Sequence, residues 1–243
     1  TLYCVPADGG HLLWALSATG PLIHIEGSPA VANGKLYAGG GAAGVLCVDP
    51  NTVTLDGKEM SVKDVPALQA AHWKRLQAKF QEDKKKDPDF AIPPSEDQLL
   101  KPAPKRVWQV GERKWHGDAA VNVVGDKVLV PTSFLDKEKV GDRALYCLKA
   151  DTGERIWETL KATGNETEPR ERWGNAFLVA QGDRFFLFNE KGDLIIAKLT
   201  PKGYEEIDRT NILQPTNTMC GRLVVWSHPA FANRSVYARN DKE

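Results

Sequence analysis

Histidine, tryptophan and charged side chains gather at four places along this chain, and their types suit two kinds of chemistry. The four groups are His24 and Glu26; Arg113, Trp115, His116 and Asp118; Arg172, Trp173 and Asn175; and Trp226 and His228. Histidines together with Asp118 and Glu26 suit a metal ion, because imidazole and carboxylate are common metal ligands. Alternatively, His116 or His228 would serve as a general base.

Tryptophans in the same groups favour a different use, because an indole face beside the guanidinium of Arg172 suits a peptide or a sugar. A third interpretation is that these side chains satisfy backbone groups and fill a channel. The sequence has no glycine-rich phosphate loop, no His-Glu-x-x-His motif and no nucleophile elbow. We therefore predict ligand-binding residues at these places, and assign no catalytic or metal-binding residue.

The elements that must position these groups are short antiparallel strands in a repeated unit. Residues 145–157, Leu-Tyr-Cys-Leu-Lys-Ala-Asp-Thr-Gly-Glu-Arg-Ile-Trp, predict two strands joined by a tight turn at Asp-Thr-Gly. Cys4 and Trp14 are separated by the same 10 residues as Cys147 and Trp157, which predicts the same hairpin register. A second hairpin surrounds Asn33-Gly34, and similar segments follow at 117–130, 174–186 and 227–237.

The spacing of these hairpins predicts the architecture. Equivalent residues are 90, 57 and 53 positions apart, at Ser28, Asp118, Asn175 and His228. Cys47 and Trp108 are 61 residues apart where other hairpins have 10, so about 51 residues are inserted in the first unit. The remaining period of about 40–50 residues, with four strands per unit, is typical of a β-propeller blade. We predict an all-β propeller domain spanning residues 1–243, with about four four-stranded antiparallel blades, whose first-strand entrances converge at a channel.

The insertion, residues 52–104, has a different composition. Residues 62–86 lack glycine and predict a helix that ends at Lys84-Lys85-Lys86, where cations favour the helix dipole. The apolar stripe of this helix is approximated by Leu68, Ala71, Trp73, Leu76 and Phe80. A proline-rich return then leads to an outer strand at 106–110. The helix is expected either to lie on its own propeller or to act as a docking arm for a partner.

Charge and cysteine content exclude several classes of protein. Lys and Arg number 32 and so do Asp and Glu, so the zero net charge argues against nucleic-acid binding. The sequence contains no run of 18 apolar residues, the length that a membrane-spanning helix needs. The sequence lacks a Cys-x-x-Cys pair, and three of its cysteines, Cys4, Cys47 and Cys147, fall at one position of the repeat. We predict that these three are buried thiols, rather than metal ligands or disulfide partners.

The repeat resembles that of the pyrroloquinoline-quinone-type (PQQ-like) β-propellers. The resemblance rests on residues 150–157, Ala-Asp-Thr-Gly-Glu-Arg-Ile-Trp, on 7–14, and on Ser-Pro-Ala-Val at 28–31 ahead of Gly-Lys-Leu-Tyr at 34–37. It implies that Trp14, Trp108 and Trp157 pack one blade against the next, with Ile207 replacing the tryptophan of the fourth unit. The family includes quinoprotein dehydrogenases and non-enzymatic propellers such as the outer-membrane assembly lipoprotein BamB.

The resemblance also sets expectations for function. Cofactor-bearing members imply a bound calcium, a catalytic Asp, often two adjacent cysteines, and a tryptophan beneath the quinone; this chain has no Cys-Cys pair, and its acidic residues do not match that set. The favoured interpretation is a non-catalytic module for a protein, small-molecule or sugar ligand. The alternative is a portion of a PQQ-dependent alcohol or sugar dehydrogenase, which would carry PQQ with calcium. The resemblance further implies a bacterial periplasmic, secreted or cell-envelope protein. Its relatives usually have seven or eight blades, so this chain, in which no signal peptide is found, is expected to be part of such a ring. The alternative is a closed ring of four blades.

Overall fold

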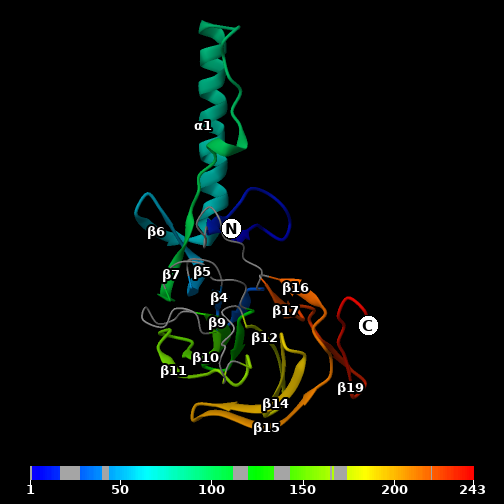
Figure 1. Cartoon of the computed structure of the whole chain (residues 1–243). Helices are drawn as coiled ribbons and strands as arrows, with labels where there is room; N and C mark the ends of the chain where they lie inside the picture. The colour runs from blue at the N-terminus through cyan, green and yellow to red at the C-terminus, as the bar shows by residue number, and fades with distance from the viewer. Residues whose placement is uncertain are drawn as a thin grey trace. The chain divides into compact units, whose positions relative to one another are not determined.

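Antiparallel strands are the commonest secondary structure among the described residues, and the chain also contains one long helix (Figure 1). The structure is a computed structural model that describes residues 2–16, 28–39, 44–111, 120–133, 143–164, 166, 174–219 and 221–243. The chain falls into two compact units. The smaller unit comprises residues 1–18 and 48–106, and the larger comprises residues 19–47 and 107–243.

Three antiparallel sheets follow one another along the chain, and they account for most of its strands. The first sheet contains β3 (Ala30–Ala32), β4 (Lys35–Gly39) and β5 (Val45–Leu55), with β6 (Lys58–Ser61) and β7 (Ala103–Val110) both paired to β5. The second sheet contains β8 (Asn122–Val124), β9 (Lys127–Ser133), β10 (Arg143–Lys149) and β11 (Arg155–Thr159). The third contains β12 (Ala176–Gln181), β13 (Arg184–Asn189), β14 (Asp193–Thr200) and β15 (Gly203–Asn211).

Turn chemistry explains why these hairpins form where they do. Asn33 and Gly34 between β3 and β4 have φ angles of 52° and 67°, the left-handed conformations that a two-residue hairpin turn requires. In the paired strands Cys147 lies opposite Trp157, and Cys4 lies opposite Trp14. The predicted equality of register between these two hairpins is therefore confirmed.

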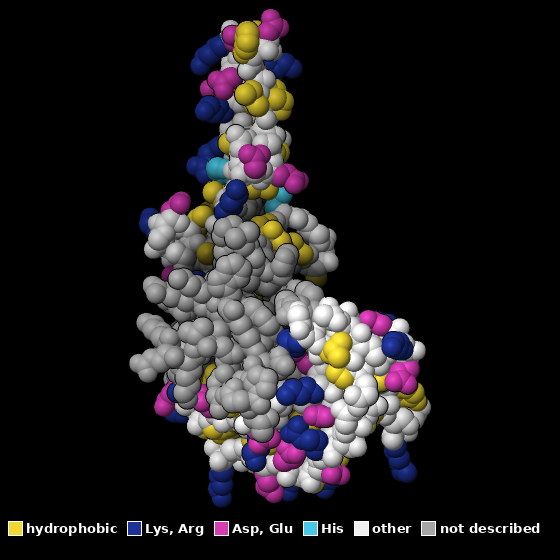
Figure 2. Space-filling model, in the orientation of Figure 1, with side chains coloured by type: hydrophobic (Ala, Val, Ile, Leu, Met, Phe, Trp, Pro, Cys, Tyr) yellow, Lys and Arg dark blue, Asp and Glu magenta, His cyan; other side chains and the backbone are white. Residues whose placement is uncertain are grey.

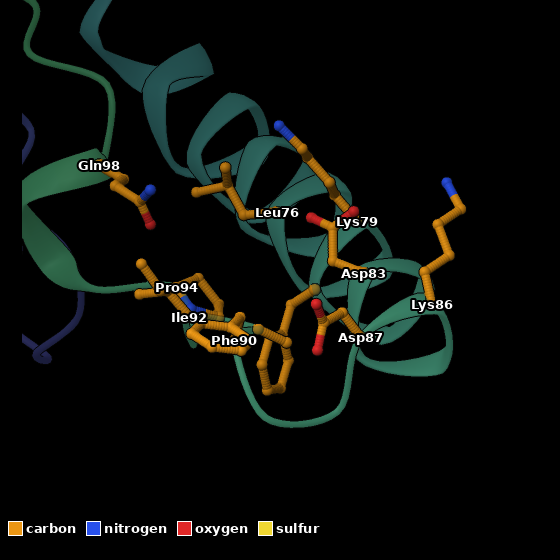
Figure 3. Close-up of a pocket in the computed structure, with 11 residues that line it drawn as sticks. Leu76, Lys79, Asp83, Lys86, Asp87, Phe90, Ile92, Pro94 and Gln98 are labelled. Atoms are coloured by element: carbon orange, nitrogen blue, oxygen red, sulfur yellow. The ribbon is translucent and has the colours of Figure 1, made fainter.

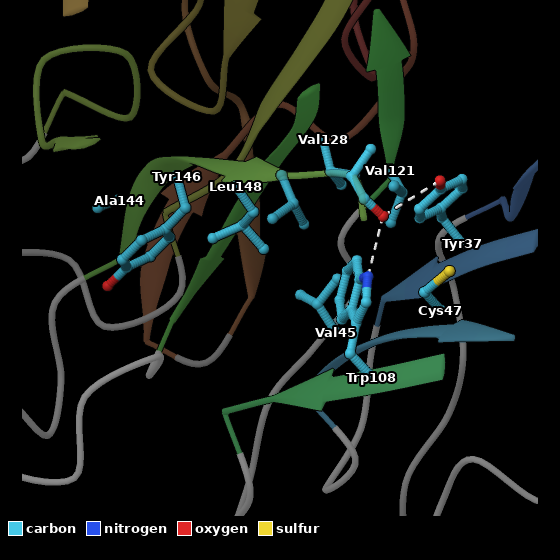
Figure 4. Close-up of a cluster of buried hydrophobic side chains, with 11 residues drawn as sticks. Tyr37, Val45, Cys47, Trp108, Val121, Val128, Ala144, Tyr146 and Leu148 are labelled. Atoms are coloured by element: carbon cyan, nitrogen blue, oxygen red, sulfur yellow. Dashed lines mark hydrogen bonds between the residues drawn. The ribbon is translucent and has the colours of Figure 1, made fainter. Parts of the chain in front are cut away.

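The core lies between neighbouring sheets, and strand β10 shows how one strand serves two interfaces. Its side chains alternate between faces, so Tyr146 and Leu148 join a cluster with residues of the first sheet (Figure 4), whereas Leu145 and Cys147 join residues of the third sheet. Cys47 is buried in the first of these clusters. Burial of Cys47 and Cys147 matches the prediction, whereas Cys4 is half-buried; the three are thiols rather than halves of a disulfide.

The smaller unit holds a two-stranded sheet and the helix. Besides β6, most of β5 and the start of β7, it contains β1 (Leu2–Cys4), β2 (Trp14–Leu16), a 3-10 turn (Val62–Asp64), α1 (Val65–Lys86) and a second 3-10 turn (Glu96–Gln98). Proline in its first turn favours the start of α1, and three lysines in the last turn suit the negative end of the helix dipole. We call residues 62–102 the arm and residues 87–102 its return segment.

Gln69 joins α1 to the rest of the smaller unit. Its side chain is buried, its Nε2 donates to the carbonyls of Leu100 (2.8 Å) and Leu12 (3.3 Å), and its Oε1 accepts from the Leu100 N–H (3.1 Å). The predicted apolar stripe is therefore only partly the packed face, because Leu68 and Ala71 are exposed. Gln69, which hydrogen-bonds to the backbone of two other segments, occupies the contact in place of these two apolar residues.

The last part of the larger unit contains two short hairpins. They are β16 (Asn217–Met219) with β17 (Arg222–Val224), and β18 (Ala230–Ala232) with β19 (Ser235–Tyr237). The sequence predicts the second of these, but we did not predict the first. The first hairpin matters because it supplies one of the charged residues at the candidate site.

Candidate functional site

Eight of the eleven predicted ligand-binding residues lie outside the described residues. These eight are His24, Glu26, Arg113, Trp115, His116, Asp118, Arg172 and Trp173. The structure places the other three, Asn175, Trp226 and His228, and it brings Asn175 and Trp226 into contact with a charged residue that the sequence did not predict, Glu190. The described part of the site is built around this glutamate.

Glu190 lies directly after β13, and it contacts residues of two other segments of the chain. Its Oε1 accepts a hydrogen bond of 2.6 Å from Trp226 Nε1, and its Oε2 is ion-paired with Arg222 Nη1. Its backbone N–H donates to the carbonyl of Asn175 (3.2 Å), and its carbonyl accepts from the N–H of Val225 (2.9 Å). The turn after β13 is thereby tied both to the start of β12 and to the segment after β17.

The ion pair of Glu190 with Arg222 is largely removed from water, since the two side chains are 3% and 12% exposed. A buried pair of this kind contributes modestly while intact, but loss of either partner leaves an uncompensated charge. The Arg222 guanidinium also lies 6.0 Å from the centre of the Trp226 ring, a cation–π distance. Trp226 is held from two sides, yet it keeps 40% of its surface exposed. Its indole is therefore an oriented and accessible aromatic face.

His228 packs on the neighbouring strand rather than on this glutamate. Its ring centre lies 3.9 Å from that of Phe177, with the planes tilted by 44°. Partial withdrawal from water lowers the pKa of His228 below its usual value, so the imidazole is neutral at pH 7. Asn175 is buried, and its Oδ1 accepts from the N–H of Ala176 (2.9 Å). Both residues consequently have structural contacts of their own.

This arrangement favours binding over acid–base chemistry among the described residues. The carboxylate of Glu190 is engaged on both oxygens, and within the described ranges no three His, Cys, Asp or Glu side chains lie close enough to hold a metal ion. Glu190 could have been found from the repeat, because the turn between second and third strands opens on the same rim as the entrance to the first strand. Arg222 could not, because its hairpin was not predicted.

The three predicted packing tryptophans share one geometry. Each donates its Nε1 to a backbone carbonyl of the next repeat: Trp14 to Pro50 (3.1 Å), Trp108 to Ala150 (2.9 Å) and Trp157 to Thr200 (2.7 Å). Trp14 and Trp108 are buried and Trp157 is half-buried. Ile207, at the corresponding position of the next unit, is exposed. These contacts fit the predicted packing role of the three tryptophans.

A separate groove lies in the arm, between α1 and the return segment (Figure 3). It has a volume of about 370 Å³, and its apolar lining includes Leu76, Phe80, Phe90, Ile92 and Pro94. Charged side chains of both signs stand beside it, at Lys79, Asp83, Lys86 and Asp87. No helix in the described ranges combines the length and hydropathy needed to cross a bilayer.

No known protein family and no curated protein matches this sequence. Among solved structures, the crystal structure of BamB from Moraxella catarrhalis is similar, with a TM-score of 0.50 and 14% sequence identity. The match covers 98% of this chain and 48% of that chain, so the chain spans about half the length of that protein. The chain therefore has the fold of a PQQ-like propeller protein, and the predicted all-β propeller of four-stranded antiparallel blades is confirmed.

Proposed function

We propose that this chain is a non-catalytic protein-interaction module and that its arm contacts the partner. One observation carries the proposal: Phe90 and Ile92, in the return segment, are 80% and 85% exposed. Side chains of this size are rarely left in water together unless they meet another surface. Hydrophobic side chains are visible on the arm in the space-filling view, with charged side chains beside them (Figure 2).

The groove beside these residues gives the contact a shape. Phe90 and Ile92 line it from the return segment, and Leu76 and Phe80 line it from α1 (Figure 3). An apolar side chain entering the groove would be covered on both sides, and such central, desolvated anchors dominate the energy of protein interfaces. Gln69 holds the two elements of the arm together at its base.

Charge indicates the chemistry of the partner. Helix α1 carries six Lys or Arg side chains, all exposed, against the two acidic residues Glu82 and Asp83. We propose as partner a protein segment in which apolar side chains are flanked by acidic ones. A lipid surface is less well matched, because Asp87 and Asp89 precede Phe90 and would face anionic headgroups.

The test is a selection of displayed random peptides on the full chain, followed by affinity measurement of the selected peptides. We expect acidic peptides with apolar anchors, and expect the double variant Phe90→Ser, Ile92→Ser to weaken them at least about tenfold. Val31→Ser, a change of a similarly exposed apolar residue in β3, is the matched control. Peptides that bind the double variant unchanged, or sedimentation of the chain with phosphatidylglycerol vesicles in place of peptide binding, would contradict the proposal.

The entrance supports a second contact of the same module. Trp226 presents its ring while its N–H is held by Glu190, an arrangement suited to stacking on a peptide or sugar ring. The dehydrogenase alternative gains no support there, because Trp226 and Arg222 engage the carboxylate oxygens of Glu190 that a calcium ion would need. The described residues thus do not fit a calcium–quinone site. Addition of PQQ with calcium should give no dye-linked oxidation of alcohols or sugars, and uptake of the quinone would reverse this conclusion.

The compartment belongs to the same proposal. We place the module in the bacterial periplasm, the cell envelope or the extracellular space, on the strength of the fold shared with BamB. Fractionation of cells that produce the natural full-length protein checks this, and recovery in the cytosol would contradict it.

A further inference from the structure

We propose that a cavity between the first and second sheets binds a small organic anion with an apolar body. The cavity lies within the larger unit and has a volume of about 720 Å³, a size typical of pockets that hold small molecules. Neither Trp226 nor any residue of the arm lines this cavity. This inference is therefore independent of the proposed protein-interaction function.

Lysine side chains give the cavity its preference for anions. Lys35 at the start of β4, Lys127 at the start of β9 and Lys149 at the end of β10 all line it, and they outnumber the carboxylates of Asp126 and Asp151. Ammonium groups that share one cavity repel one another, and an anion between them relieves the repulsion. The Lys127 side chain is only 19% exposed, so water screens its charge less than that of an ordinary surface lysine.

The present partners of two of these lysines are replaceable. Lys127 is ion-paired with Asp126, and Lys149 with Glu154 at 2.6 Å, and both carboxylates are exposed. Water screens an ion pair whose carboxylate is exposed, so such a pair is weak, and an ammonium has three N–H donors. Each lysine can therefore bind a further anion, and removal of its carboxylate partner should strengthen that binding.

The residues that line the cavity disfavour ligands that donate hydrogen bonds and favour ligands with an apolar part. The carbonyl of Ala150 accepts from Tyr37 Oη (3.3 Å) and from Trp108 Nε1 (2.9 Å), so both of its lone pairs are engaged (Figure 4). This acceptor is thus not available to a ligand that donates hydrogen bonds. Val107 and Ile156 supply apolar surface on strands from two sheets. The ligand should then carry its charge toward the lysines and its apolar part toward these side chains.

The probes are two fluorescent dyes, 8-anilinonaphthalene-1-sulfonate and its neutral analogue N-phenyl-1-naphthylamine. Both are titrated into the full chain in the Phe90→Ser, Ile92→Ser background, so that binding in the arm groove does not contribute. We expect saturable binding of about one sulfonate dye per chain. Its affinity should be at least about tenfold higher than that of the neutral dye, because only the sulfonate can accept a charged hydrogen bond from a lysine. Equal affinity for the two dyes would overturn the proposal.

Variants of the cavity make the test specific. Lys127→Gln should weaken the sulfonate dye about tenfold, Asp126→Asn should strengthen it, and Val107→Trp should block it by filling the apolar wall. The matched controls are Lys198→Gln and Asp183→Asn, an exposed ion pair that does not line the cavity, and they should leave the affinity unchanged. Equal effects of cavity and control variants would show general surface electrostatics and overturn the proposal.

Discussion

Replacement of Trp108 by phenylalanine tests whether the repeated tryptophans hold neighbouring sheets together. Trp108 is buried in the cluster between the first and second sheets, 6.0 Å from the ring of Tyr37, and donates to the carbonyl of Ala150 in the turn that follows β10 (Figure 4). Phenylalanine keeps an aromatic ring at the site. It removes the N–H donor and one ring of the indole.

The structure sets the size of the expected loss. Truncation of a buried tryptophan to alanine costs about 3–5 kcal/mol, and phenylalanine keeps roughly half of that packing, so the packing loss is about 2 kcal/mol. The hydrogen bond contributes about 1 kcal/mol, with no larger penalty, because Tyr37 still donates to the same carbonyl. We expect the free energy of unfolding to fall by about 2–3 kcal/mol.

Urea unfolding followed by circular dichroism measures this loss. Trp157→Phe is the matched control, because Trp157 makes the equivalent hydrogen bond to Thr200 but is half-buried, and it should cost less. Combining Trp108→Phe with Tyr37→Phe removes both donors to one buried carbonyl, so the double variant should lose about 1 kcal/mol more than the sum. A loss below about 1 kcal/mol for Trp108→Phe, or equal losses at the two tryptophans, would refute the reasoning.

Three further predictions concern single sites. Gly153→Ala should lower the free energy of unfolding by about 2–3 kcal/mol, because φ is +73° and the new Cβ would lie 2.7 Å from Trp108 Cε3. Gly125→Ala, where φ is +60° but the space is open, should lower it by about 1 kcal/mol. Equal urea midpoints for the two variants would contradict the steric argument. Burial raises the pKa of Cys147 from 9.0 to about 11, so its thiol should resist iodoacetamide at about pH 8 in the folded protein. Since the unfolded thiol ionises first, stability should fall as pH rises from 9 toward 11, and alkylation detected by mass spectrometry under native conditions would argue against this burial. Gln69→Leu removes three hydrogen bonds between α1 and the backbone, so amide hydrogen exchange in the return segment should speed up at least about tenfold; unchanged exchange would show that the helix is held otherwise.

Local patterns predicted the hairpins well, for a physical reason. A turn such as Asn33-Gly34 depends on the φ preferences of its own two residues, so it can be recognised without knowledge of the rest of the molecule. The equal spacing of Cys4 to Trp14 and of Cys147 to Trp157 likewise predicted equal registers, which the strand pairing confirms. Helix α1 begins at Val65 rather than residue 62, because the three residues before it form a 3-10 turn.

The polar contacts were harder to foresee, because their partners are distant in sequence. Gln69 is a polar residue next to the predicted stripe, and nothing local shows that Leu12 and Leu100 will bring backbone groups to it. Glu190 similarly meets Arg222 through a short hairpin that carries little signal of its own. Of the predicted ligand-binding residues, Trp226 donates a hydrogen bond to Glu190, whereas His228 packs on Phe177.

The sequence by itself therefore determined the repeat, the class of fold and the position of the tryptophans, since these depend on turn geometry and on a period counted along the chain. Only the tertiary structure decided which side chains meet: the tryptophan Nε1 groups with the carbonyls of the next repeat, Trp226 with Glu190, and three lysines around one cavity. The reason is that hydrogen bonds and ion pairs depend on distances of a few ångströms between residues far apart in the chain. Sheet packing sets those distances, and no local pattern records them.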